Sequence, residues 1–172
     1  MKKLGVMLVG ILAVMVLVAC SGGEEKEREK VFKVHEDFHE LVDGVDTAFI
    51  DTEDAVSKYN SGEYTYDEYK EIKQEREKEL EEFKKDLDGI SKPKDGDALD
   101  YYDKSFNLIT GVITLAETSL EVPNDLGDEV AVEGYNDSIR AERDHLDVSI
   151  EEYEELQEEL KEKDEEYKKA FK

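Results

Sequence analysis

The apolar residues of this chain recur at steps of three and four positions over most of its length, a spacing that strongly restricts the fold. Side chains three and four apart lie on one face of an α-helix, so each run predicts a helix with one apolar seam. No segment alternates polar and apolar residues as a half-buried strand does. Four runs are present, at about 25–59, 65–90, 97–121 and 134–171. The sequence therefore predicts an all-α protein.

Helix-breaking residues fall between these runs. The segments 60–62, 91–96 and 122–127 hold glycines and both prolines of the chain. Thr65 and Glu68 have the spacing of a capping box, which predicts the start of the second helix, and Asp97 is the expected N-cap of the third. Connections this short favour antiparallel neighbours. We therefore expect an elongated, antiparallel up-down-up-down four-helix bundle with coiled-coil-like seams.

The four expected helices differ in length. The first and the fourth have about 36 to 38 residues, or about 55 Å, whereas the other two have about 25 residues, or about 37 Å. In an antiparallel bundle the start of the first helix and the end of the fourth lie at the same end. We therefore expect a two-helix stalk there, with the 59–66 and 122–134 connections at the far end.

The N-terminus is typical of an export signal. Two lysines precede an uncharged apolar run at 4–19, which is short for a bilayer span of about 20 residues. The run ends in Leu17-Val18-Ala19-Cys20, which resembles the lipobox of bacterial lipoproteins. This resemblance implies cleavage between Ala19 and Cys20 and lipidation of Cys20. Cys20 is the only cysteine, so it has no partner for an internal disulfide.

The expected domain organisation follows from this resemblance. Residues 1–19 form the signal peptide, residues 20–30 a lipidated tether and residues 31–172 the helical bundle. Two or more acyl chains hold a protein stably on a membrane, whereas a single chain does so only marginally. The mature chain is therefore expected on the extracytoplasmic face of the cell membrane, attached through the lipid at Cys20.

The charge of the chain excludes some classes of partner. The formal net charge is −24, and removing residues 1–19 takes away two lysines and no acid, which gives −26. Such a surface repels phosphate backbones, so we expect no nucleic-acid partner. The sequence also has no glycine-rich phosphate loop and no arrangement typical of a catalytic nucleophile. No cofactor is indicated.

Residues 35–39 read His-Glu-Asp-Phe-His and resemble the zinc-binding helix of zincin metalloproteases. In that motif two histidines one turn apart bind zinc, and the glutamate activates a water molecule. Zincins place this helix after a sheet, but the 14 residues between Cys20 and His35 have no strand pattern. A polar helix surface is the preferred interpretation. A zinc-dependent hydrolase using His35, Glu36 and His39 is the alternative.

A second metal hypothesis uses two Glu-x-x-His pairs. Glu36 with His39 and Glu142 with His145 have the spacing found in di-iron bundles. Counted from the far end of the bundle, the two histidines differ in height by about 15 Å. We therefore reject a shared metal site.

Three charged residues lie on or beside the apolar seams, which is costly unless they are paired. Lys73, Arg76 and Glu142 are expected at similar heights, with threonines nearby. We therefore predict that Glu142 meets Arg76 or Lys73 inside the bundle. Such a polar layer would set the register of the helices, or it would line a ligand pocket.

Two surfaces are candidates for recognition. Tyrosines gather at the far end, where they either anchor a partner or plug the open end of the bundle. A second apolar stripe on the third helix is either an oligomer face or covered by the connection that follows it. The first surface comprises Tyr59, Tyr64, Tyr66, Tyr69 and Tyr135, and the second comprises Tyr101, Leu108, Val112 and Leu115.

Beyond the lipobox, the layout resembles that of cell-wall-binding lipoproteins of Gram-positive bacteria. The likeness rests on Cys20, the charged segment 74–85 and the ending Tyr167-Lys168-Lys169-Ala170-Phe171. The strong acidity departs from that pattern, because it disfavours direct contact with anionic wall polymers. The sequence thus predicts a non-catalytic, lipid-anchored helical bundle that binds a protein or a cell-envelope component. It leaves the oligomeric state open.

Overall fold

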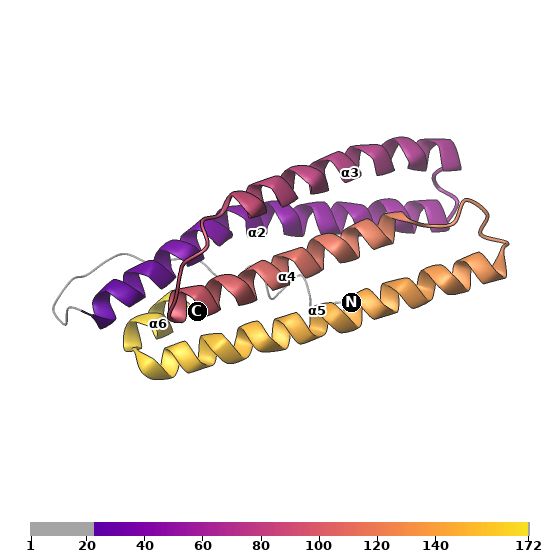
Figure 1. Cartoon of the computed structure of the whole chain (residues 1–172). Helices are drawn as coiled ribbons and strands as arrows, with labels where there is room; N and C mark the ends of the chain where they lie inside the picture. Colours follow the sequence, from indigo (N-terminus) through magenta and orange to yellow (C-terminus); the bar gives the residue numbers. More distant parts are fainter. Residues whose placement is uncertain (1–22, 172) are drawn as a thin grey trace.

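The computed structural model describes residues 23–171, so the expected signal peptide and Cys20 lie outside the described part of the chain. Within that part there are five helices and no strands, which confirms the all-α prediction (Figure 1). The helices are α2 (Glu24–Asn60), α3 (Tyr66–Gly89), α4 (Asp97–Leu120), α5 (Glu129–Lys163) and α6 (Glu165–Ala170).

The four long helices pack antiparallel in the up-down-up-down order that the short connections predicted (Figure 1). Helix α4 is central, because it contacts α2, α3 and α5. Helix α3 also packs on α2, but no comparable contact joins α3 to α5. The bundle is therefore open on the side where α3 and α5 face each other across α4.

Burial follows this arrangement. Helix α4 has apolar residues on two faces and buries the longest set of side chains, from Ala98 to Leu120. Helix α3 buries only Tyr69, Leu80 and Leu87, and α5 buries only three leucines. An amphipathic helix packs through one stripe and leaves the rest to solvent. Helices α3 and α5 therefore contribute charged surface, and α2 and α4 together contribute most of the core.

The starts of α3 and α4 show which of the predicted capping residues are correct. The capping box is confirmed: the Thr65 backbone N–H donates to Glu68 Oε2 at 2.8 Å, and the Glu68 N–H donates to Thr65 Oγ1 at 3.3 Å. The expectation for Asp97 is wrong, because Gly96 is the N-cap of α4, with φ of 78°. A glutamate from another helix takes over the capping role there. The Ala98 N–H donates to Glu27 Oε1 at 3.3 Å.

The last predicted helix is wrong at both ends. Helix α5 begins at Glu129, earlier than expected, because the Asp128 side chain accepts hydrogen bonds from the backbone of residues 130 and 131. It ends at Lys163, because Asp164 is extended and its carboxylate instead caps α6, accepting from Glu166 N at 2.8 Å. Helix α6 then folds back onto the bundle and buries Tyr167 and Ala170.

The expected two-helix stalk is also wrong. The 90–96 connection brings the start of α4 level with the start of α2, where Glu27 meets Ala98. Helix α6 covers the same end, with the Phe32 and Tyr167 rings 5.4 Å apart (Figure 1). Helix α2 begins at Glu24, close to the start at about 25 that the first apolar run predicted, so residues 24–30 of the expected tether are its first two turns. Only residues 20–23 therefore remain between the expected lipid and the bundle.

Candidate functional site

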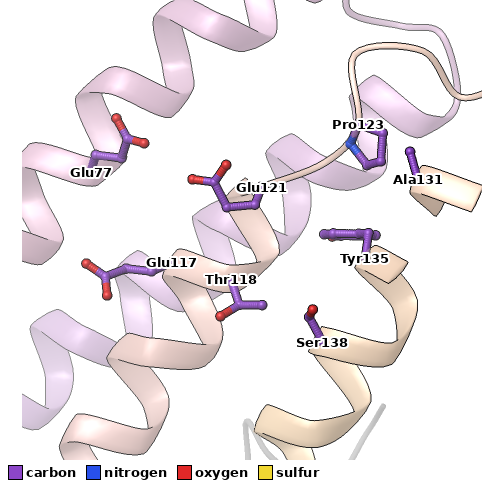
Figure 2. Close-up of a pocket in the computed structure, with 8 residues that line it drawn as sticks. All are labelled: Glu77, Glu117, Thr118, Glu121, Pro123, Ala131, Tyr135 and Ser138. Carbon is purple, nitrogen blue, oxygen red and sulfur yellow. The ribbon is translucent and has the colours of Figure 1, made fainter. Parts of the chain in front are cut away.

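The open side of the bundle holds a groove between α3 and α5, above the C-terminal turns of α4 (Figure 2). Its volume is about 540 Å³. The groove walls come from three helices and one connection, and most of the lining side chains are polar. They are Glu77, Glu117, Thr118, Glu121, Pro123, Ala131, Tyr135 and Ser138. We name this feature the acidic groove.

Three carboxylates and two ammonium groups set the electrostatics of the acidic groove. Lys73 Nζ lies 2.7 Å from a Glu121 oxygen and 3.7 Å from a Glu77 oxygen. Lys84 Nζ lies 2.6 Å from a Glu117 oxygen. Both lysines belong to α3, and the ion pairs to Glu117 and Glu121 connect α3 with α4. The five groups together leave one negative charge in excess.

Tyr135 forms the α5 wall of the acidic groove (Figure 2). Its hydroxyl donates to the Ser119 carbonyl at 3.0 Å, which fixes the ring against the end of α4. Burial raises the pKa of Tyr135, so the hydroxyl remains a neutral donor at physiological pH. A fixed aromatic ring beside carboxylates is an arrangement that attracts ammonium and guanidinium groups.

The predicted pairing of Glu142 with Arg76 or Lys73 is wrong. Arg76 reaches Asp51 at 3.3 Å and Glu79 at 2.5 Å, and Lys73 pairs with the acids of the groove. Glu142 lies half-buried on α5, and no ion pair to it is found within residues 23–171. Long basic side chains can cover apolar surface with their stems while the charged end reaches solvent. A residue on or beside an apolar seam can therefore have its charged group outside the bundle.

The tyrosines at the far end mostly plug the bundle. Tyr59 and Tyr69 are buried, and their rings stack with centroids 4.7 Å apart. The Tyr69 hydroxyl donates to the Leu120 carbonyl at 2.8 Å. Tyr66 is 43 % exposed and Tyr64 is half-buried, so only these two are accessible at the tip outside the groove. Of the five candidate tyrosines, Tyr135 is the one that lines the acidic groove.

The second apolar stripe of the third helix is covered by α5 and α6, neither of which was the expected cover. Tyr101 and Val112 are buried, and Gly111 lies against Leu146 of α5. The Tyr101 ring stacks on Phe171 with centroids 5.3 Å apart. This face therefore belongs to the core and is not available to a second copy of the chain.

The His-Glu-x-x-His segment lies near the end where α2 begins. His35 Nδ1 is 2.8 Å from the Tyr101 hydroxyl, and the centroids of the His35 and His39 rings are 6.1 Å apart. His39 Nε2 is buried without a hydrogen-bond partner in the described part of the chain, and Glu36 is exposed. Burial, with a smaller effect from His39, lowers the pKa of His35 to about 4. No group of three or more potential ligands that could hold a metal ion is found among residues 23–171.

Comparison with known proteins assigns no family. No family model matches the chain, and no curated protein or solved structure matches it. In addition, none of the helices between residues 23 and 171 is both long and apolar enough to cross a bilayer.

Sequence reasoning missed most of the acidic groove. Glu77, Glu117 and Glu121 are ordinary solvent-face glutamates by their spacing, and nothing local distinguishes them from the other acids of the chain. They come together only because α4 separates α3 from α5. The tyrosine at position 135 was the one groove residue that the sequence pointed to.

Proposed function

We propose that this chain is a lipid-anchored, extracytoplasmic binding protein without catalytic activity, and that the acidic groove receives a basic segment of a partner protein. The observation that carries the proposal is the groove itself, a recess lined by three glutamates and one tyrosine. The lipobox at Leu17-Val18-Ala19-Cys20 supports the anchored location.

Charge complementarity favours a basic partner. The acidic groove has an excess of carboxylates, and the chain as a whole has a net charge of −24. A field of this sign raises the association rate of cationic partners and disfavours anionic wall polymers. A lysine or arginine of the partner would displace Lys73 or Lys84 from its glutamate, which exchanges one ion pair for another. The excess carboxylate of the acidic groove would then supply a charge-dependent part of the affinity, and the partner's backbone and apolar side chains would supply the rest.

Groove geometry favours a polypeptide segment over a small ion. A volume of about 540 Å³ holds several side chains, and the recess is open along one side. On either side of Tyr135 the α5 wall has small residues, Ala131 and Ser138, which leave room for an incoming chain (Figure 2). These features suit a short helix or an extended segment that carries two or three basic side chains.

The test uses the mature chain, residues 20–172, and a fluorescent lysine- and arginine-rich helical peptide as the probe. The variant Glu77→Gln/Glu117→Gln/Glu121→Gln removes the groove carboxylates. The control Glu133→Gln/Glu151→Gln/Glu154→Gln makes the same charge change at exposed positions of α5. We expect the groove variant to weaken binding about tenfold, or about 1.4 kcal/mol, and the control to weaken it far less. Equal losses in both variants would show general charge attraction and refute the groove.

The zinc-dependent hydrolase that uses His35, Glu36 and His39 is separated from this proposal by metal analysis. A hydrolase of that kind requires about one zinc per chain, and a His39→Ala variant would lose it. We expect purified chain dialysed against zinc and then washed to retain none in stoichiometric amount. Stoichiometric zinc that depends on His39 would favour the hydrolase instead.

A further inference from the structure

Three segments that are far apart in the sequence meet at one end of the bundle. Residues 24–35 begin α2, residues 91–100 lead into α4, and residues 158–171 end α5 and form α6 (Figure 1). Ion pairs join them: Arg28 lies 2.5 Å from Asp164, and Lys163 lies 2.8 Å from Asp97. We name these three segments together the base.

The charge of the molecule is distributed unevenly between the base and the rest. The base has 10 basic and 13 acidic side chains, which gives a net charge of −3. The remainder of residues 23–171, which we name the body, has 10 basic and 34 acidic side chains, which gives −24. Nearly all of the net charge therefore lies away from the base, along the elongated bundle, which we name the rod, and at its far end.

The base also has cationic groups free for another partner. Lys26, Lys33 and Lys94 are exposed, and within residues 23–171 no carboxylate lies within 4.0 Å of their ammonium groups. Other lysines of the base pair with neighbouring acids of the base, as Lys168 does with Glu165 and Lys169 with Glu166. The base therefore combines near-neutral overall charge with unpaired lysines.

We propose that the base is a membrane-facing surface that contacts anionic lipid headgroups, and that repulsion of the body from the same headgroups holds the rod upright. The inference rests on the proposed attachment at Cys20, which lies four residues before the start of α2. At physiological ionic strength the Debye length is about 8 Å, so headgroup charge acts only on groups close to the surface. In an upright rod those groups are the 10 basic and 13 acidic side chains of the base, which nearly cancel. In a rod lying flat they are the acids of the body.

An upright rod determines where the acidic groove is presented. Helix α2 has 37 residues and is about 55 Å long. Glu117 and Glu121 lie 20 and 24 residues beyond the start of α4, or about 30 and 36 Å along the helix. The acidic groove would thus open several Debye lengths above the headgroups, clear of their field.

The test attaches the chain chemically, so that it does not depend on lipidation by a host cell. Chain 20–172 is coupled through its only thiol, Cys20, to a maleimide lipid in a supported bilayer, and neutron reflectometry measures the thickness of the protein layer. On bilayers with 30 % phosphatidylglycerol at 0.05 M salt we expect a layer of about 55 Å. On pure phosphatidylcholine, or at 0.5 M salt, the orienting field is absent or screened, and we expect a thinner, tilted layer.

Two matched triple variants test whether the orientation depends on the lysines of the base or only on the total charge of the chain. Lys26→Glu/Lys33→Glu/Lys94→Glu reverses the free lysines of the base and should thin the layer on the anionic bilayer. Lys70→Glu/Lys78→Glu/Lys85→Glu makes the same change at exposed positions of α3 in the body and should keep the layer upright. Equal thickness on both lipids, or equal effects of the two variants, would overturn the proposal. Mass spectrometry of Cys20 from a native host tests the anchor separately, because unmodified Cys20 would refute attachment but not the measured orientation.

Discussion

The Tyr101 hydroxyl lies 2.8 Å from His35 Nδ1 and 2.6 Å from the Tyr153 hydroxyl, so one hydrogen-bonded row crosses α2, α4 and α5. Phe171, which follows α6, stacks on the Tyr101 ring and packs edge-on to His35 with centroids 5.4 Å apart. Tyr101 is 1 % exposed. A single side chain thus joins the core of the bundle to the C-terminal segment of the base.

Replacing Tyr101 by phenylalanine should destabilise the bundle without changing its fold. The variant keeps the ring stacking but removes the hydroxyl that His35 and Tyr153 share, so these two half-buried side chains lose a hydrogen-bond partner. We expect a loss of about 1–3 kcal/mol in the free energy of unfolding, measured by urea denaturation. The control is Tyr102→Phe, whose hydroxyl makes one longer bond of 3.3 Å to the Ile90 carbonyl. If the control lost as much as Tyr101→Phe, the shared hydrogen-bonded row would not be the cause.

The same row should make stability depend on pH. Burial lowers the pKa of His35 to about 4 in the folded chain, so the unfolded chain, with an ordinary pKa near 6.5, takes up the proton first as pH falls. The stabilisation is fully present above pH 6.5 and is lost as pH falls through 4. The total is about 3 kcal/mol, of which about 2 kcal/mol is lost by pH 5.

A His35→Gln variant isolates this effect from the many carboxylates of the chain. Glutamine can still hydrogen-bond the Tyr101 hydroxyl but does not titrate, and the carboxylates are unchanged between the two proteins. The difference in free energy of unfolding between wild type and variant should therefore shift by about 2 kcal/mol between pH 7 and pH 5. A difference that is constant over this range would contradict the lowered pKa.

The helices were predictable because the three- and four-residue spacing of apolar side chains is a local property of the sequence. The seam of the third run and the Thr65–Glu68 capping box placed elements that the structure confirms. The break at Asp164 was missed because the three-four spacing continues through Leu156, Leu160 and Tyr167 across it. The signal that could have found it is an aspartate followed by two glutamates, the pattern of an N-cap with an acidic first turn.

The site was predictable only in small part, because it depends on which helices become neighbours. Spacing tells which face of a helix is apolar, but it does not tell that α4 lies between α3 and α5. The predicted stalk was wrong for a related reason. The 90–96 connection runs along α2 before α4 begins, so the lengths of the helices alone did not show that α4 starts level with the start of α2. Charged positions such as Arg76 were misplaced because a long side chain beside a seam reaches surface acids.

Thr52 offers a prediction in the stabilising direction. Its side chain is fully buried on α2, and its Oγ1 has no hydrogen-bond partner in residues 23–171. Thr52→Val replaces the unpaired hydroxyl with a methyl group of similar size, so we expect the free energy of unfolding to rise by about 1 kcal/mol. In the control Thr47→Val, an exposed hydroxyl that donates to the Asp43 carbonyl at 2.8 Å is removed, and no gain is expected. A destabilised Thr52→Val would show that the hydroxyl is bonded in solution.

The contact of α2 with α3 depends on a glycine in the middle of α2. A Cβ added at Gly44 would lie 2.7 and 2.9 Å from two atoms of the Phe83 ring. Phe83 is half-buried and packs against the main core, so the ring cannot move away freely. In an unobstructed helix, glycine to alanine stabilises by about 0.8–1 kcal/mol. The clash should outweigh this gain at Gly44, since overpacking costs about 1–3 kcal/mol.

Gly134 provides the matched comparison, because it lies within α5 and an added Cβ there meets nothing within 4 Å. We expect Gly134→Ala to raise the melting temperature and Gly44→Ala to lower it, although both make the same chemical change in a helix. Adding Phe83→Leu to Gly44→Ala should recover part of the loss, because leucine does not extend as far as the tip of the phenylalanine ring. If both alanine variants were stabilised alike, α3 would not approach α2 at Gly44 as closely as this packing requires.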